Sequence, residues 1–97
     1  MDDATSSLAD AWEIFDLALR MGEGLNEESL TNLKKALEEC ERAWQDKDHI
    51  PRLAVNILVD IFPATESNAA LYDEAEHEKV MRVAFDLHDQ VGRCVGL

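Results

Sequence analysis

The sequence has little of several residue types that small proteins use for covalent or catalytic tasks. Its 97 residues include two cysteines, two prolines, one tyrosine and three histidines. Cys40 and Cys94 lie far apart, form no Cys-x-x-Cys pair and have no neighbouring basic cluster, which argues against a disulfide or a redox function. Both occupy apolar positions of helical patterns, so we expect buried free thiols.

Basic residues are scarce, since nine Lys and Arg stand against 21 Asp and Glu and the formal net charge is −12. The acids gather towards the two ends of the chain. Residues 1–30 hold eight acids and one base, residues 31–52 hold five of each, and residues 53–97 hold eight acids and three bases. Such a surface repels the phosphates of nucleic acids and of anionic lipids, so we expect no direct nucleic-acid partner and no membrane partner.

Long apolar runs are absent as well, and none reaches the length that spans a bilayer. The N-terminal stretch MDDATSS is acidic where a secretory signal is basic and then apolar, so we expect a cytoplasmic protein. The apolar fraction of 46% is nevertheless typical of a globular chain, and a chain of this length suffices for one modest core. The sequence therefore predicts a single domain over residues 1–97.

Apolar residues recur at helical spacing in four segments, which predict helices over about 7–21, 27–46, 51–62 and 74–95. Ser7 is the expected N-cap of the first helix, and the Gly22 and Gly24 pair is expected to end it. Asn26 is the expected N-cap of the second helix and Asp73 that of the last. The core residues predicted for the first two helices are Leu8, Ala11, Trp12, Phe15, Ala18, Leu19, Leu30, Leu33, Leu37, Cys40 and Trp44.

The segment from Ile50 to Phe62 allows two interpretations. As a strand it would present a continuous apolar face rich in β-branched residues, but no other segment alternates to pair with it. As a helix that begins at Pro51 and ends before Pro63, it is apolar except for one polar stripe. We adopt the helix and expect it to be buried on most sides. The residues predicted to be most buried are Leu53, Ile57, Leu58, Ile61 and Phe62.

The predicted fold class is all-α, a compact antiparallel four-helix bundle with a very apolar third helix at its centre and the other three helices packed on it. A helix that is apolar on most sides needs more cover than three amphipathic neighbours in so short a chain provide. A homodimer is therefore one expectation.

Six polar or aromatic residues are the candidates for contact with a partner. Arg52, Asn56 and Asp60 form the polar stripe of the third helix, which is either the solvent-facing side of a nearly buried helix or a contact strip. Tyr72 lies in the acidic connector before the last helix, where we expect an exposed contact aromatic, and Asp73 and Glu74 follow at the start of that helix.

The spacing Glu74-x-x-His77 is that of the metal ligands in di-iron bundles. Such sites need a second Glu-x-x-His pair and two further Glu residues, and His88 has Phe85 three residues before it instead of an acid. Gly-rich phosphate loops and the serine and zinc hydrolase motifs are also missing. We expect no cofactor, no metal and no enzyme activity.

The function that best fits this composition is a non-enzymatic protein–protein interaction module whose acidic helical surface meets a protein partner or a second copy of the chain. A narrower alternative is an inhibitor or immunity-type protein whose carboxylates block a basic, nucleic-acid-binding partner. A metal-binding helical enzyme is the third hypothesis, and the sequence shows no site for it.

Overall fold

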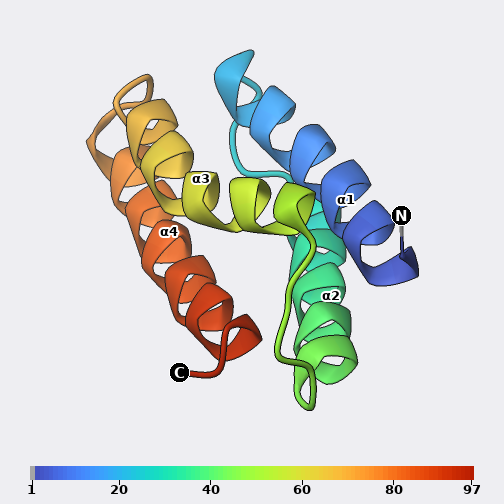
Figure 1. The fold of residues 1–97 in the computed structure, drawn as a ribbon. Helices are drawn as coiled ribbons and strands as arrows, with labels where there is room; N and C mark the ends of the chain where they lie inside the picture. Colours follow the sequence, from blue (N-terminus) through green and yellow to red (C-terminus); the bar gives the residue numbers. More distant parts are fainter. Residues whose placement is uncertain (1) are drawn as a thin grey trace.

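The structure is a computed structural model that describes residues 2–97. Four helices joined by short loops form this part of the chain. Their bounds are α1 (Asp3–Arg20), α2 (Glu27–Trp44), α3 (Arg52–Ala69) and α4 (Glu74–Cys94). Helices α1 and α2 form one antiparallel hairpin and α3 and α4 another, and the two hairpins pack together through α1 with α3 and α2 with α4 (Figure 1). The prediction of an all-α four-helix bundle is confirmed.

Helices α1, α2 and α4 begin at capping side chains, whereas α3 begins after Pro51 without a side-chain cap. The Asn26 carboxamide accepts a hydrogen bond from the Ser29 amide at 2.8 Å, and the Asp73 carboxylate accepts one from the Glu76 amide at 3.2 Å, so both predicted N-caps are confirmed. The prediction of Ser7 as the first N-cap is wrong. Asp2 takes that position and accepts a hydrogen bond from the Thr5 amide at 2.7 Å, which also lowers the pKa of Asp2 from its usual 3.8.

Glycine ends α1 as predicted. Gly22 has a φ of +78°, a left-handed conformation that costs a residue with a Cβ atom free energy. This conformation lets the Gly22 amide donate to the Leu19 carbonyl at 3.1 Å and the Glu23 amide to the Ala18 carbonyl at 3.0 Å, the pair of bonds of a Schellman motif. The last turn of α1 is thereby closed, and the loop that follows leaves it at a fixed angle.

The core lies between the helices and follows the predicted seams. Every predicted core residue of α2, from Leu30 to Trp44, is buried, and so are Leu8, Trp12, Phe15 and Leu19 of α1. Ala11 is half-buried at the edge of the core, and Ala18 is half-buried beside a groove described below. Because apolar burial is the main favourable term in folding, these seams hold the two hairpins together.

The two cysteines are buried and free, as predicted. The Cys40 thiol donates to the carbonyl of Ala4 at 3.5 Å, and the Cys94 thiol donates to the carbonyl of Leu37 at 3.2 Å. Burial raises the pKa of Cys40 to about 12 and the pKa of Cys94 to about 11, because a thiolate there would lack water. Both side chains are therefore packing groups rather than nucleophiles.

The third helix differs from the prediction in its position. It is not central, since α3 contacts α1 and α4 but not α2, which lies diagonally across the bundle. Only one face of α3 is therefore covered. Ile57, Leu58 and Ile61 are buried as predicted, whereas Phe62 is half-buried and Leu53 is 40% exposed, so the prediction of a buried Leu53 is wrong.

The third helix also continues through Pro63 to Ala69, which corrects the predicted end before that proline. Pro63 is exposed, so the amide hydrogen it lacks is missing on the solvent side, where water reaches the unpaired carbonyl. Thr65, Asn68 and Ala69 beyond it are buried, and their packing outweighs the local cost. Figure 1 shows α3 changing direction near its middle, as helices do at an internal proline.

Candidate functional site

The predicted polar stripe lies on the outside of the bundle. Arg52, Asn56 and Asp60 are all exposed on α3. They are bordered by Val55 and Val59, which are exposed as well, so the stripe is not the only wet part of a buried helix. The structure brings the three side chains onto one helix face, and none of them lines either of the two hollows described below.

The other three candidates lie in the turn between α3 and α4, at the opposite end of α3. Asp73 is the N-cap of α4, and Glu74 is exposed in the first turn of that helix. Tyr72 corrects the expectation of an exposed contact aromatic, because its ring is half-buried against the core. Its hydroxyl donates to the Leu19 carbonyl at 2.6 Å and accepts from the Gly24 amide at 3.0 Å.

Two neighbours of Tyr72 strengthen the same junction. The Glu76 carboxylate accepts a hydrogen bond from the Leu25 amide at 3.3 Å, so α4 holds the α1–α2 loop at a second point. The His77 ring donates from Nδ1 to the Ala69 carbonyl at 2.8 Å, because a carbonyl can only accept, and it thereby caps the end of α3. The bonds of Tyr72 and Glu76 join the α3–α4 hairpin to the end of α1 and the α1–α2 loop, and we call these bonds the Tyr72 latch. The His77 bond braces the α3–α4 turn itself.

A row of apolar side chains on α1 points away from the core. Ile14, Leu17 and Met21, here called the outer α1 row, are 62%, 47% and 67% exposed. Their spacing of three and four residues places them on one face, opposite the buried side of the helix. Helix α1 is therefore apolar on two faces, and no element of the described chain covers the second.

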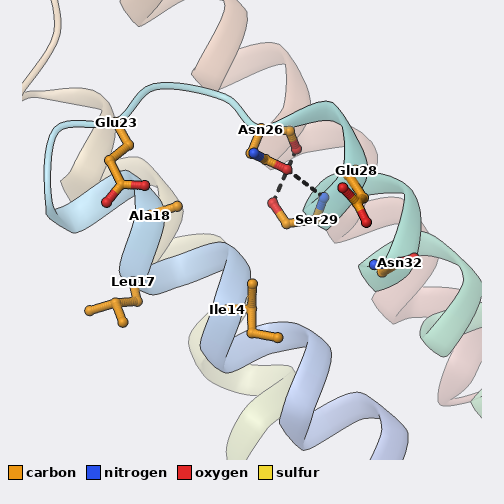
Figure 2. A pocket seen from close by; sticks show the side chains of 8 residues that line it. All are labelled: Ile14, Leu17, Ala18, Glu23, Asn26, Glu28, Ser29 and Asn32. Atoms are coloured by element: carbon orange, nitrogen blue, oxygen red, sulfur yellow. Dashed lines mark hydrogen bonds between the residues drawn. The ribbon is translucent and has the colours of Figure 1, made fainter.

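A groove between α1 and α2 runs beside this row and has a volume of about 440 Å³ (Figure 2). The α1 side supplies apolar groups and the α2 side polar ones, while the loop between the helices closes one end. Residues that line this α1–α2 groove are Ile14, Leu17, Ala18, Glu23, Asn26, Glu28, Ser29 and Asn32. The α1–α2 groove thus combines an apolar wall with a polar and acidic one.

The two charged side chains that line the groove, Glu23 and Glu28, are both acidic, and the first 28 residues of the chain are rich in acids as a whole. Exposed carboxylates in this part of the chain are Asp2, Asp3, Asp10, Glu13, Glu23, Glu27 and Glu28. The one base among residues 1–30, Arg20, is bound to Asp16 through an Nε to Oδ2 contact of 3.1 Å. No other carboxylate between positions 2 and 28 has a basic partner in the structure. The groove therefore lies in a field that attracts cations.

A larger hollow of about 540 Å³ lies at the other end of the bundle, between the start of α1 and the loop that precedes α3. Its lining mixes Asp2 and Asp3 with Lys47 and His49, so acids and bases meet there. Of these two hollows, the α1–α2 groove is the one whose lining contains acids and no base.

The outer α1 row is the feature that the sequence predictions missed. The signal was present, because Ile14, Leu17 and Met21 are the large apolar residues of the first helix that remain once its core face has been assigned. Their spacing repeats the helical period of the core face on the opposite side.

Comparison of the chain with protein-family models, with curated proteins and with solved structures finds no match. Within residues 2–97, no cluster of three or more His, Cys, Asp or Glu side chains is arranged to hold a metal ion. None of the described helices is long and apolar enough to cross a bilayer.

Proposed function

We propose that this chain is a non-enzymatic interaction module that presents the acidic surface of α1 and the α1–α2 loop to a basic protein partner. The observation that carries the proposal is the set of unpaired exposed carboxylates between Asp2 and Glu28, with Arg20 already bound to Asp16. A surface with many unpaired carboxylates produces a negative potential that speeds the approach of a basic surface. The inhibitor hypothesis uses the same surface and adds that the partner is a nucleic-acid-binding protein.

The test compares two neutralised variants that carry the same charge. One is Asp10→Asn/Glu13→Gln/Glu23→Gln, here the α1-neutral variant. The matched control, Asp60→Asn/Asp86→Asn/Asp89→Asn, removes three exposed acids from α3 and α4. Association of each with a helix-forming leucine–lysine peptide is followed by stopped-flow fluorescence, using the native tryptophans.

We expect the α1-neutral variant to associate roughly tenfold more slowly than the wild type, and the control variant to change by about twofold or less. Equal slowing by both variants would mean that the acids are a general solubility coat without a binding face, and the proposal would be wrong.

The dependence on salt concentration is a second test of the same acidic surface. Screening relieves the repulsion among the acids of the folded chain, so we expect the melting temperature of the free protein to rise with added NaCl. The same screening should slow association with the peptide. A complex whose association rate does not change with salt would contradict the proposal.

A further inference from the structure

The outer α1 row and the α1–α2 groove point to a specific form of partner. We infer that the α1–α2 groove binds an amphipathic helix, whose apolar residues lie against Ile14 and Leu17 and whose Lys or Arg side chains lie beside Glu23 and Glu28. The inference rests on the proposed function and names the shape and patterning of the basic partner.

The apolar part of the inference follows from exposure. Apolar side chains scattered singly over a surface need no explanation, but Ile14, Leu17 and Met21 are consecutive members of one helical row. Ile14 and Leu17 also line a hollow rather than a flat surface, so a partner seated in that hollow buries the apolar area of the α1 wall. Groups of this kind are the usual anchors where one helix binds in the groove of another protein.

A helical partner follows from the backbone of the groove walls. The described chain has no strand, so an extended peptide would find no sheet edge to pair with. The backbone groups of the α1 wall are already bonded within that helix. An extended peptide would therefore bury amides and carbonyls without partners, whereas a helix satisfies its own backbone.

The charge of the residues that line the α1–α2 groove indicates that the partner helix carries basic residues. The lining of the α1–α2 groove contains Glu23 and Glu28 and no Lys, Arg or His. Asp10 and Glu13 on the exposed side of α1 add two more carboxylates near the apolar row. A second copy of the chain, with its net charge of −12, would bring further acids to this surface and is disfavoured.

The closed end of the groove is held in place before a partner binds. Glu23 and Asn26 belong to the loop whose Gly24 amide donates to Tyr72 and whose Leu25 amide donates to Glu76. A loop fixed at two points loses less conformational entropy on binding than a free one. The Tyr72 latch therefore serves the groove as well as the fold.

The experiment uses the full chain and two peptides of identical leucine and lysine composition. In one peptide the leucines form a single helical face, and in the other the same residues are scrambled so that no face forms. Two matched variants accompany the wild type. Ile14→Ala/Leu17→Ala shortens the groove wall, and Val55→Ala/Val59→Ala shortens two exposed apolar residues on α3. Calorimetry gives the dissociation constants at low salt.

We expect the amphipathic peptide to bind the wild type at least about tenfold more tightly than the scrambled one, because only the first presents a continuous apolar face. Ile14→Ala/Leu17→Ala should weaken binding of the amphipathic peptide about tenfold, and the α3 variant should leave it unchanged. Equal binding of the two peptides, or equal binding by the groove variant and the wild type, would overturn the inference. The α1-neutral variant would still slow association in that case, so the proposed function is judged separately.

Discussion

The hydroxyl of Tyr72 offers a sharp test of how the two loops at this end of the bundle are held. Tyr72→Phe keeps the half-buried ring and removes the bonds to the Leu19 carbonyl and from the Gly24 amide. The Leu19 carbonyl keeps the Gly22 amide as a donor, whereas the Gly24 amide has no other partner in the structure. Two neutral hydrogen bonds in a half-buried setting contribute about 1–2 kcal/mol together.

For a domain of this size the loss corresponds to a fall in melting temperature of about 4–16 °C, measurable by circular dichroism. Hydrogen exchange shows where in the structure the loss of stability occurs. The Gly24 amide should lose protection in Tyr72→Phe, while the Ser29 amide, bonded to Asn26 in the next turn of the chain, should keep its protection as an internal control. Wild-type protection at Gly24 together with an unchanged melting temperature would refute this account of the latch.

Three further predictions concern the core and the assembly. Leu58→Ala should lower the free energy of unfolding by about 2–5 kcal/mol in urea denaturation, because Leu58 is buried between α3 and its neighbours and its loss leaves a cavity. The thiols of Cys40 and Cys94 have pKa values raised to about 12 and 11 from 9.0, so the folded state holds these protons more tightly and stability should fall as pH rises above 9. Melting curves of Cys40→Ala/Cys94→Ala should show a weaker alkaline decline than those of the wild type. The homodimer stays a prediction, and light scattering should return twice the chain mass of 10.9 kDa for the wild type and the single mass for Val59→Asp.

The helices that sequence patterns describe best are those with one apolar face. In α2 the seam from Leu30 to Trp44 and the Asn26 cap are both local signals, since each depends on residues within one or two turns. The structure confirms both. Helix α1 shows the limit of the same approach, because Asp2 rather than Ser7 is its cap and a hydrogen-bonding side chain stands at either position.

The position of α3 could not be read from its own residues. Periodicity tells which face of a helix is apolar, but the helix that covers the face is decided by the packing of the two hairpins. Leu53 and Val59 are as apolar as Ile57 and Ile61, and they are exposed because α2 lies diagonally across the bundle. The continuation through Pro63 has the same origin, since Asn68 is held by a 2.9 Å hydrogen bond to Asp16 of α1.

The candidate site was missed for a related reason. A helix with two apolar faces fits a sequence pattern equally well whether its second face is covered by another element or left open. Tyr72 shows the converse, because an aromatic residue in an acidic connector has the sequence signature of an exposed contact and the structure uses its hydroxyl to join two loops.

Because the outer α1 row is exposed, substitutions in it can change partner binding without changing the stability of the fold. Residues with most of their surface in water contribute little to folding, and substitutions there typically change the free energy of unfolding by about 0.5 kcal/mol or less. Ile14→Ala/Leu17→Ala replaces one residue that is mostly in water and one that is about half exposed with a better helix former, and it leaves the buried face, from Leu8 to Leu19, intact. A loss of peptide binding in a variant that melts like the wild type would therefore measure recognition alone. Because the fold does not depend on these exposed apolar side chains, a binding partner is the physical explanation to test for them.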